Sequence, residues 1–154
     1  MNNLEAGTRL TDKTKKDIIY YRRNKNGGMD MTKISDAEYE VMKIIWKYSP
    51  INTNDVTEKL LATTAWTPET IHTLLNRLVK KKAITYSKES RVFVYTPLIT
   101  QKEYLEHKSS TFLRQYFDGN LSALMANYMH SEKISDEQLK ALKKLFTSPE
   151  ERGK

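Results

Sequence analysis

Apolar residues recur at helical spacing in several separate blocks of this chain, and most blocks open with a helix-capping residue. Ser35 and Glu38 precede the first block and form a capping box, in which the two side chains satisfy the first free amides of a helix. Ser49 and Pro50 close the block, because the residue before a proline avoids the helical region. We therefore predict a first helix that begins at Ser35, and a short strand at Ile51.

Two more helices are predicted before residue 83. Asn52 or Thr53 can cap the second. Thr67 can cap the third, with Pro68 at the first helical position, where a missing amide does no harm. The apolar residues of the third helix fall on one face: Ile71, Leu74, Leu75, Leu78 and Val79. The opposite face is polar and leads into three consecutive lysines.

After residue 83 the pattern changes to two short runs rich in β-branched and aromatic residues, Ile84–Tyr86 and Val92–Tyr95. Such runs are typical of strands. We expect the polar segment Ser87–Arg91 to join them and Pro97 to stop the second. The resulting order of elements is that of a winged helix-turn-helix. We predict a mainly α fold with a small β-sheet, in which residues 31–98 form a winged-helix DNA-binding domain.

Three further helices are predicted between residues 99 and 147. Thr100 with Glu103, and Ser135 with Gln138, form capping boxes, and Asn120 can cap the helix between them. A three-helix unit of this size buries little apolar surface alone, so we expect a dimerisation domain that pairs with a second copy. The expected dimerisation residues are Tyr104, Phe112, Leu113, Tyr116, Phe117, Leu121, Leu124, Met125, Tyr128, Leu139, Leu142, Leu145 and Phe146.

The two ends of the chain differ from the rest. Residues 1–30 are rich in basic residues and end in Asn26-Gly27-Gly28, followed by Met29 and Met31. Their composition favours a disordered leader or an over-extended start whose natural beginning is Met29 or Met31. A basic arm that adds phosphate contacts is the competing interpretation. We expect residues 148–154 to form a flexible tail.

Composition narrows the classes of function. The formal net charge of +7 and the pI of about 9.4 favour an anionic partner, nucleic acid or a membrane surface. The chain has no cysteine and three scattered histidines, so we expect no metal, no cofactor and no enzyme activity. No apolar run reaches the roughly 20 residues of a membrane span. We expect a cytoplasmic protein without membrane insertion.

The third helix carries most of the candidate DNA-binding residues. In helix-turn-helix proteins the N-terminal half of this helix meets base edges, and basic residues suit phosphates. We expect Lys88 and Arg91 to grip the DNA backbone from either side of the wing turn. The expected base readers are Glu69, His72, Thr73 and Asn76, accompanied by Thr67 and Thr70; the expected phosphate contacts on this helix are Arg77, Lys80, Lys81 and Lys82. A solvated helix face is the competing interpretation.

Three segments together resemble the BlaI/MecI penicillinase repressors: Ile34–Trp46, Trp66–Leu78 and Arg91–Pro97. The resemblance runs from about Ile34 to Phe146 and leaves residues 1–30 outside. It implies a homodimer with N-terminal winged-helix domains and a C-terminal helical dimerisation region. It also implies binding to double-stranded operator DNA with dyad symmetry, and repression of β-lactamase or penicillin-binding-protein genes.

The resemblance further implies control by proteolysis. In the family, a β-lactam-sensing membrane metalloprotease system triggers cleavage of the repressor within its dimerisation region. The family's scissile Asn–Phe pair aligns with Asn127-Tyr128 here, where the aromatic residue is changed. Staphylococcal members carry basic residues where this chain has Glu69 and His72, so operator preference is expected to differ. The alternative functions are a winged-helix protein-interaction module and a regulator of an unrelated regulon.

Overall fold

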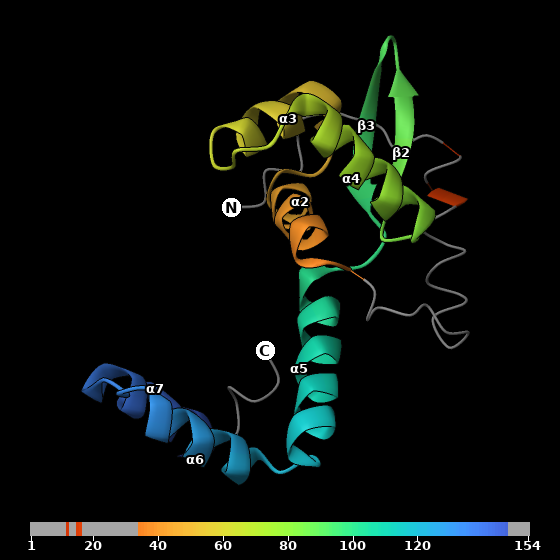
Figure 1. Cartoon of the computed structure of the whole chain (residues 1–154). Helices are drawn as coiled ribbons and strands as arrows, with labels where there is room; N and C mark the ends of the chain where they lie inside the picture. Colours follow the sequence, from red (N-terminus) through yellow and green to blue (C-terminus); the bar gives the residue numbers. More distant parts are fainter. Residues whose placement is uncertain (1–11, 13–14, 17–33, 148–154) are drawn as a thin grey trace. The chain divides into compact units, whose positions relative to one another are not determined.

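The structure is a computed structural model that describes Asp12, Lys15, Lys16 and residues 34–147 of the 154-residue chain (Figure 1). Apart from those three residues, the expectations for residues 1–30 and 148–154 lie outside the described part. The chain divides into two compact units, residues 1–108 and residues 109–154. Each unit is described by itself.

The first unit has the predicted order of a winged helix, so the expected fold class of helices with a small sheet is confirmed. Three helices are followed by a hairpin, which projects beyond them in Figure 1. The elements are α2 (Asp36–Tyr48), β1 (Ile51–Asn52), α3 (Thr53–Leu61), α4 (Pro68–Lys80), β2 (Ile84–Glu89), β3 (Val92–Pro97) and the first half of α5 (Gln101–Phe117).

Local capping explains where α2, α3 and α4 begin. Ser35 Oγ accepts a hydrogen bond from the Glu38 amide at 3.2 Å, and Glu38 Oε2 accepts one from the Ser35 amide at 3.0 Å. Asn52, one of the two candidates, caps α3 by accepting from the Asp55 amide at 2.9 Å. Thr67 caps α4 in the same way, with Pro68 in the first turn. The predicted starts of all three helices are confirmed.

The sheet is antiparallel, with strand order β1-β3-β2. Its hairpin is longer than expected, because β2 continues through Glu89, which pairs with Val92. The predicted loop Ser87–Arg91 is therefore wrong, and Ser90 with Arg91 forms a two-residue turn. Ser90 has a positive φ of 55°, as the first central position of the hairpin-type turns requires. Polar residues 87–89 can form strand because one face of an antiparallel sheet can face water.

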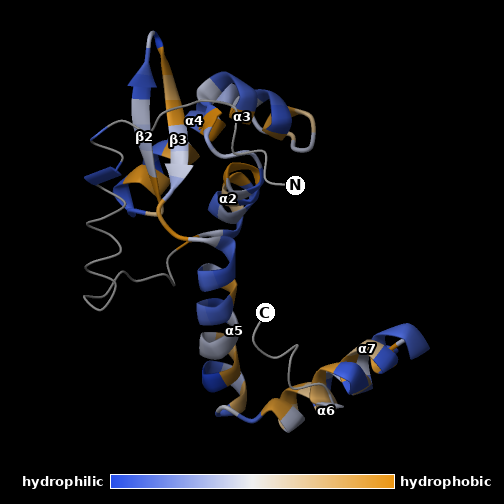
Figure 2. Cartoon of the chain, turned by 180° about the vertical axis from the view of Figure 1, so that it is seen from behind, coloured by the Kyte–Doolittle hydropathy of each residue, from blue (hydrophilic) through white to orange (hydrophobic). Residues whose placement is uncertain are grey.

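The core of the first unit lies between the three helices and the sheet. The apolar face predicted for α4 is the buried one. Figure 2 shows hydrophobic and hydrophilic stretches side by side on the helices of this unit. Most of the largest fully buried apolar side chains come from the three helices and β2, and Ile99 follows β3: Val41, Met42, Ile45, Val56, Leu60, Ile71, Leu75, Leu78, Ile84 and Ile99.

The start of α5 belongs to this core. Tyr104 is 3% exposed; its ring stacks on Tyr39 with centroids 5.5 Å apart and lies 5.6 Å from the ring of Trp46. Trp46 Nε1 also donates a hydrogen bond to the Ile99 carbonyl at 2.9 Å. The expectation that Tyr104 serves dimerisation is therefore wrong, because residues of its own unit cover it. The boundary between the units accordingly falls inside α5, after Lys108.

The second unit contains the end of α5, α6 (Leu121–Ser131) and α7 (Asp136–Thr147). The α5 helix stops where Asp118 and Gly119 take positive φ values of 49° and 76°. The predicted caps are present, since Asn120 accepts from the Ala123 amide at 3.0 Å, and Ser135 pairs with Gln138. None of the described residues 109–147 is buried. This unit therefore lacks a dry core of its own within the described part of the chain.

Candidate nucleic-acid interface

The α4 helix presents a polar surface opposite its buried face. Its four buried residues, Ile71, Leu74, Leu75 and Leu78, hold it against the rest of the first unit. The predicted DNA-binding residues of its cap and body are all exposed: Thr67, Glu69, Thr70, His72, Thr73, Asn76, Arg77 and Lys80. The structure thus brings the predicted base readers together on one helix surface.

Hydrogen bonds within the helix engage the three threonines of this surface. Thr67 Oγ1 accepts from the Thr70 amide at 3.3 Å and lies 3.2 Å from Thr70 Oγ1. The Thr73 hydroxyl donates to the Glu69 carbonyl at 2.9 Å. A hydroxyl that donates once can still accept. Thr70 and Thr73 therefore combine a structural role with the capacity to accept one more hydrogen bond.

Glu69 stands exposed in the first turn of α4. Its own backbone amide and the Thr67 hydroxyl hydrogen-bond the carboxylate and lower its pKa below 4.5, and the nearby His72 adds to the effect. The side chain is therefore ionised at neutral pH. A carboxylate repels phosphates, yet it can accept a hydrogen bond from the amine of cytosine.

Asn76 and Arg77 follow one helical turn later. Both side chains are exposed, and within the described residues neither is engaged in a hydrogen bond. An asparagine amide can pair with an adenine edge, and an arginine guanidinium with a guanine edge or a phosphate. Both groups are therefore available for hydrogen bonds to DNA.

Of the three consecutive lysines, Lys81 differs from its neighbours. Lys80 and Lys82 are exposed, whereas Lys81 Nζ lies 2.6 Å from Glu38 Oε2. The Glu38 side chain is only 2% exposed. The phosphate contact expected of Lys81 stays a prediction, because its ammonium group already pairs with Glu38 in the structure. Sequence reasoning assigned Glu38 only to the cap of α2 and missed its second partner, which lies 43 positions away.

Burial alone would raise the pKa of Glu38. The hydrogen bonds from Lys81 and from the Ser35 amide, with the positive charges of Lys81 and Arg77, outweigh burial and bring the pKa below 4.5. Glu38 is therefore ionised at neutral pH, and the contact with Lys81 is an ion pair.

The hairpin supplies further basic groups. Lys88 and Arg91 are exposed, on β2 and in the two-residue turn. Phe93, directly across from Lys88, is 42% exposed and packs its ring against Tyr86 with centroids 4.9 Å apart. Sequence reasoning did not single out Phe93, because the apolar run Val92–Tyr95 gives no alternation that separates inner from outer positions.

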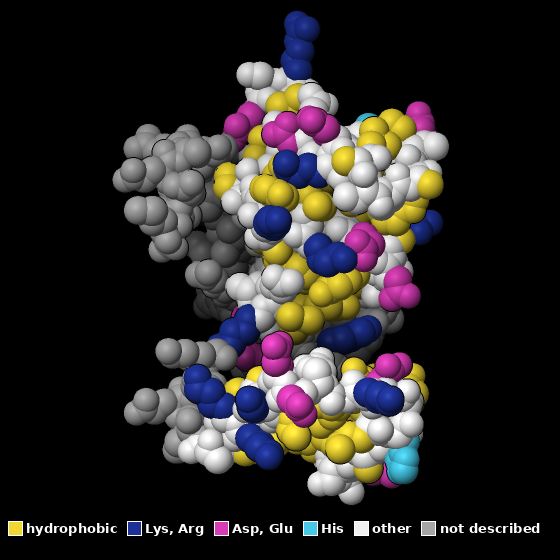
Figure 3. Space-filling model, turned by 90° about the vertical axis from the view of Figure 1, so that its left-hand side faces the viewer, with side chains coloured by type: hydrophobic (Ala, Val, Ile, Leu, Met, Phe, Trp, Pro, Cys, Tyr) yellow, Lys and Arg dark blue, Asp and Glu magenta, His cyan; other side chains and the backbone are white. Residues whose placement is uncertain are grey.

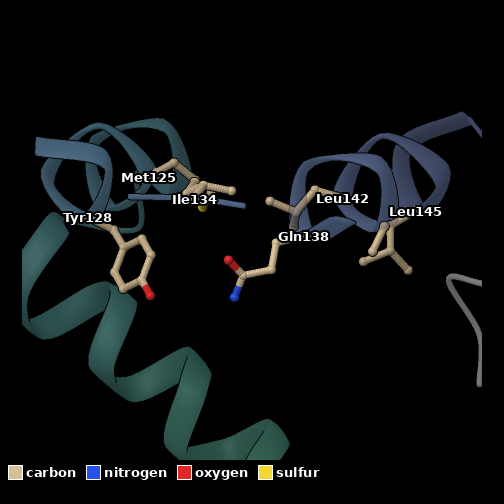
Figure 4. Close-up of a pocket in the computed structure, with 7 residues that line it drawn as sticks. Met125, Tyr128, Ile134, Gln138, Leu142 and Leu145 are labelled. Carbon is tan, nitrogen blue, oxygen red and sulfur yellow. The ribbon is translucent and has the colours of Figure 1, made fainter. Parts of the chain in front are cut away.

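The second unit exposes most of the expected dimerisation residues. Figure 3 shows hydrophobic side chains open on the surface, and α6 and α7 enclose an open groove of about 360 Å³ (Figure 4). Six of its lining residues are Met125, Tyr128, Ile134, Gln138, Leu142 and Leu145. The expected dimerisation residues with large exposed side chains are Phe112, Tyr116, Leu121, Tyr128, Leu139, Leu145 and Phe146; Leu113, Phe117, Leu124, Met125 and Leu142 are partly exposed.

Other kinds of site find little support. In the part of the chain that the structure describes, no group of three or more His, Cys, Asp or Glu side chains could hold a metal ion. Among the same residues, no helix is long and apolar enough to cross a membrane.

Comparisons with known proteins bear on the family of this chain. The penicillinase repressor family model matches residues 34–148. The penicillinase repressor of Bacillus licheniformis is 46% identical over 121 residues, which cover 79% of this chain and 94% of that protein. The methicillin resistance regulatory protein MecI of Staphylococcus aureus is 31% identical over 113 residues, which cover 73% of this chain and 92% of that protein. The solution structure of the DNA-binding domain of the repressor BlaI matches 47% of this chain and 88% of that domain, with 58% sequence identity and a TM-score of 0.45. The chain belongs to the penicillinase repressor family.

Proposed function

We propose that this chain is a transcriptional repressor of β-lactam resistance genes, which binds dyad-symmetric operator DNA as a homodimer in the cytoplasm. The observation that carries the proposal is the exposed polar surface of α4, followed at once by a basic hairpin, in a chain of the penicillinase repressor family. The family consists of DNA-binding repressors, so the chain is a regulator and not an enzyme.

On α4 the N-terminal half faces the bases. Glu69, His72, Thr73 and Asn76 meet base edges in the major groove, with Thr67 and Thr70 beside them. The expected phosphate contacts are the exposed basic residues: Arg77, Lys80, Lys82, Lys88 and Arg91.

Pairing of two chains supplies the affinity that one domain lacks. Residues 31–97 hold ten basic and seven acidic side chains, too small an excess for tight binding through bulk charge. Two linked domains raise each other's effective concentration at a dyad operator. The exposed apolar side chains of residues 109–147 form the surface through which the copies pair.

Cleavage between Asn127 and Tyr128 inactivates the repressor. Both residues are exposed in α6. A break there separates Met125 from the groove residues on α7, so the pairing surface and the link between the two domains are lost together. The partner in this control is a β-lactam-sensing membrane metalloprotease system.

A gel-shift series with dyad-containing promoter DNA tests the function. The wild type should bind, and Asn76→Ala with Arg77→Ala should bind far more weakly, because two exposed groups of α4 that are expected to contact DNA are gone. Lys108→Ala, which removes an exposed positive charge from α5, should bind almost normally. Absence of binding to any such DNA at low salt would contradict the proposal.

A protein-interaction module remains the second candidate, because the same α4 surface could dock a protein. Salt dependence separates the two. Contacts with phosphates release counterions, so affinity falls steeply as salt rises. Weak salt dependence together with tight binding to a protein partner would favour the interaction module.

A further inference from the structure

A single oxygen of Glu38 joins two elements that are far apart in sequence. Glu38 Oε2 accepts a hydrogen bond from the Ser35 amide at 3.0 Å and another from Lys81 Nζ at 2.6 Å. Ser35 is the N-cap of α2, and Lys81 is the C-cap of α4. The Glu38–Lys81 bridge therefore fastens the beginning of α2 to the end of α4.

The hairpin of β2 and β3 is the wing, and it begins directly after the end of α4. The amides of Lys82 and Ala83 donate to the carbonyls of Val79 and Leu78, both at 3.1 Å, and β2 starts at Ile84. Lys82 takes a positive φ of 61° at this reversal. A side chain that fixes Lys81 thus fixes the last turn of α4 and the first residue of the wing together.

The remaining contacts of α4 are less directional. Its buried residues are aliphatic; burial of apolar surface is not directional, although close packing also restrains the helix. An ion pair with a buried carboxylate contributes little net stability compared with apolar side chains of the same volume, although breaking it is costly. Its contribution here is therefore mainly geometric, because it holds the end of α4 within hydrogen-bond distance of the beginning of α2.

We propose that the Glu38–Lys81 bridge sets the position of α4 relative to α2, and that Lys81 is a positioning residue for operator binding instead of a phosphate contact. The inference rests on the proposed function. It assigns to operator recognition a buried carboxylate, Glu38, that lies on another helix.

Glu38→Gln separates positioning from phosphate contact. If Lys81 touched phosphate, the substitution would leave affinity unchanged or raise it, because it releases the lysine and removes a negative charge. Positioning predicts weaker operator binding of the full chain, by roughly two- to thirtyfold, with an unchanged slope of log affinity against log salt. Fluorescence anisotropy with dyad DNA at several salt concentrations measures both quantities, well below the unfolding temperature of each variant.

Lys81→Met and Lys80→Met form the matched pair. Lys81→Met should weaken binding without changing the slope, whereas Lys80→Met should lower the slope by about one, as loss of a phosphate contact does. Lys81→Arg should restore binding, because guanidinium can also pair with Glu38. A Lys81→Met slope that falls like that of Lys80→Met, or binding by Glu38→Gln as tight as the wild type, overturns the proposal.

Hydrogen exchange gives a readout without DNA. In Glu38→Gln the amides of Lys82 and Ala83 should exchange faster, while the Asp55 amide, bonded to the α3 cap, stays as in the wild type. If the exchange rates of the Lys82 and Ala83 amides are unchanged, the proposal that the Glu38–Lys81 bridge fixes the end of α4 is overturned. If the wild type binds no dyad DNA, the proposed function has failed, and exchange alone decides whether the bridge holds the helix end.

Discussion

Glu38 makes the stability of the first unit depend on pH. The pKa of Glu38 lies below 4.5, its ordinary value, in the folded chain. Between the folded pKa and 4.5, the unfolded chain therefore binds more protons than the folded chain. The stabilisation is fully present above pH 4.5 and is lost as the pH falls through the folded pKa.

Glu38→Gln should therefore be less stable than the wild type at pH 7, by roughly 1–3 kcal/mol for a weakened hydrogen bond to a charged group. This difference in the free energy of unfolding should narrow as the pH falls below 4.5, because the wild-type carboxylate then becomes neutral too. Urea unfolding of both proteins between pH 7 and pH 3 measures the gap. A constant gap over this range would mean that the charge of Glu38 does not stabilise the fold.

Single residues show where sequence reasoning stops. The spacing of apolar residues identified the buried face of α4 and hence the exposure of its expected base readers. It could not distinguish Lys81 from Lys80 and Lys82, because the partner that singles out Lys81 comes from another helix. Tyr104 was misplaced for the same reason, since its neighbours Tyr39 and Trp46 are brought to it only by the fold.

At the scale of elements, the wing is expected to act through charge alone. Lys88 and Arg91 are exposed on a hairpin held by a two-residue turn. Replacing both by alanine should lower the salt slope by about two and weaken binding by a similar factor on every DNA sequence, because phosphate contacts carry no sequence information.

Salt titrations on an operator and on unrelated DNA of equal length measure this effect. Asn76→Ala is the contrasting variant, because it should weaken operator binding more than binding to unrelated DNA. A double wing variant that changes the preferred sequence would show that the wing reads bases.

Helix starts were predictable and the hairpin length was not, for a physical reason. A cap is decided within four residues, as Asn52 and Thr67 show. The extension of β2 through Glu89 depends on pairing with β3, which polar residues accept once a partner strand is present. Local sequence therefore identified helix starts better than strand ends.

At the scale of the whole molecule, the second unit is expected to hold two chains together. Leu142 lines the groove between α6 and α7. Leu142→Asp places a charge in that apolar surface, so the protein should sediment as a monomer and bind a dyad operator about 10²- to 10⁴-fold more weakly.

Ser122→Asp is the matched control, because it adds the same charge at an exposed position in the first turn of α6. It should remain dimeric. A Leu142→Asp protein that sediments as a dimer would move the pairing surface away from the groove.

The placement of the aromatic residues has a consequence for spectroscopy. The only two tryptophans of the chain, Trp46 and Trp66, both pack against the core of the first unit. Indole emission therefore follows that unit alone, while the far-ultraviolet circular dichroism signal contains the helices of both. Melting curves from the two signals should coincide only if the units unfold as one cooperative block. The chain thus carries an intrinsic optical label on its DNA-binding half.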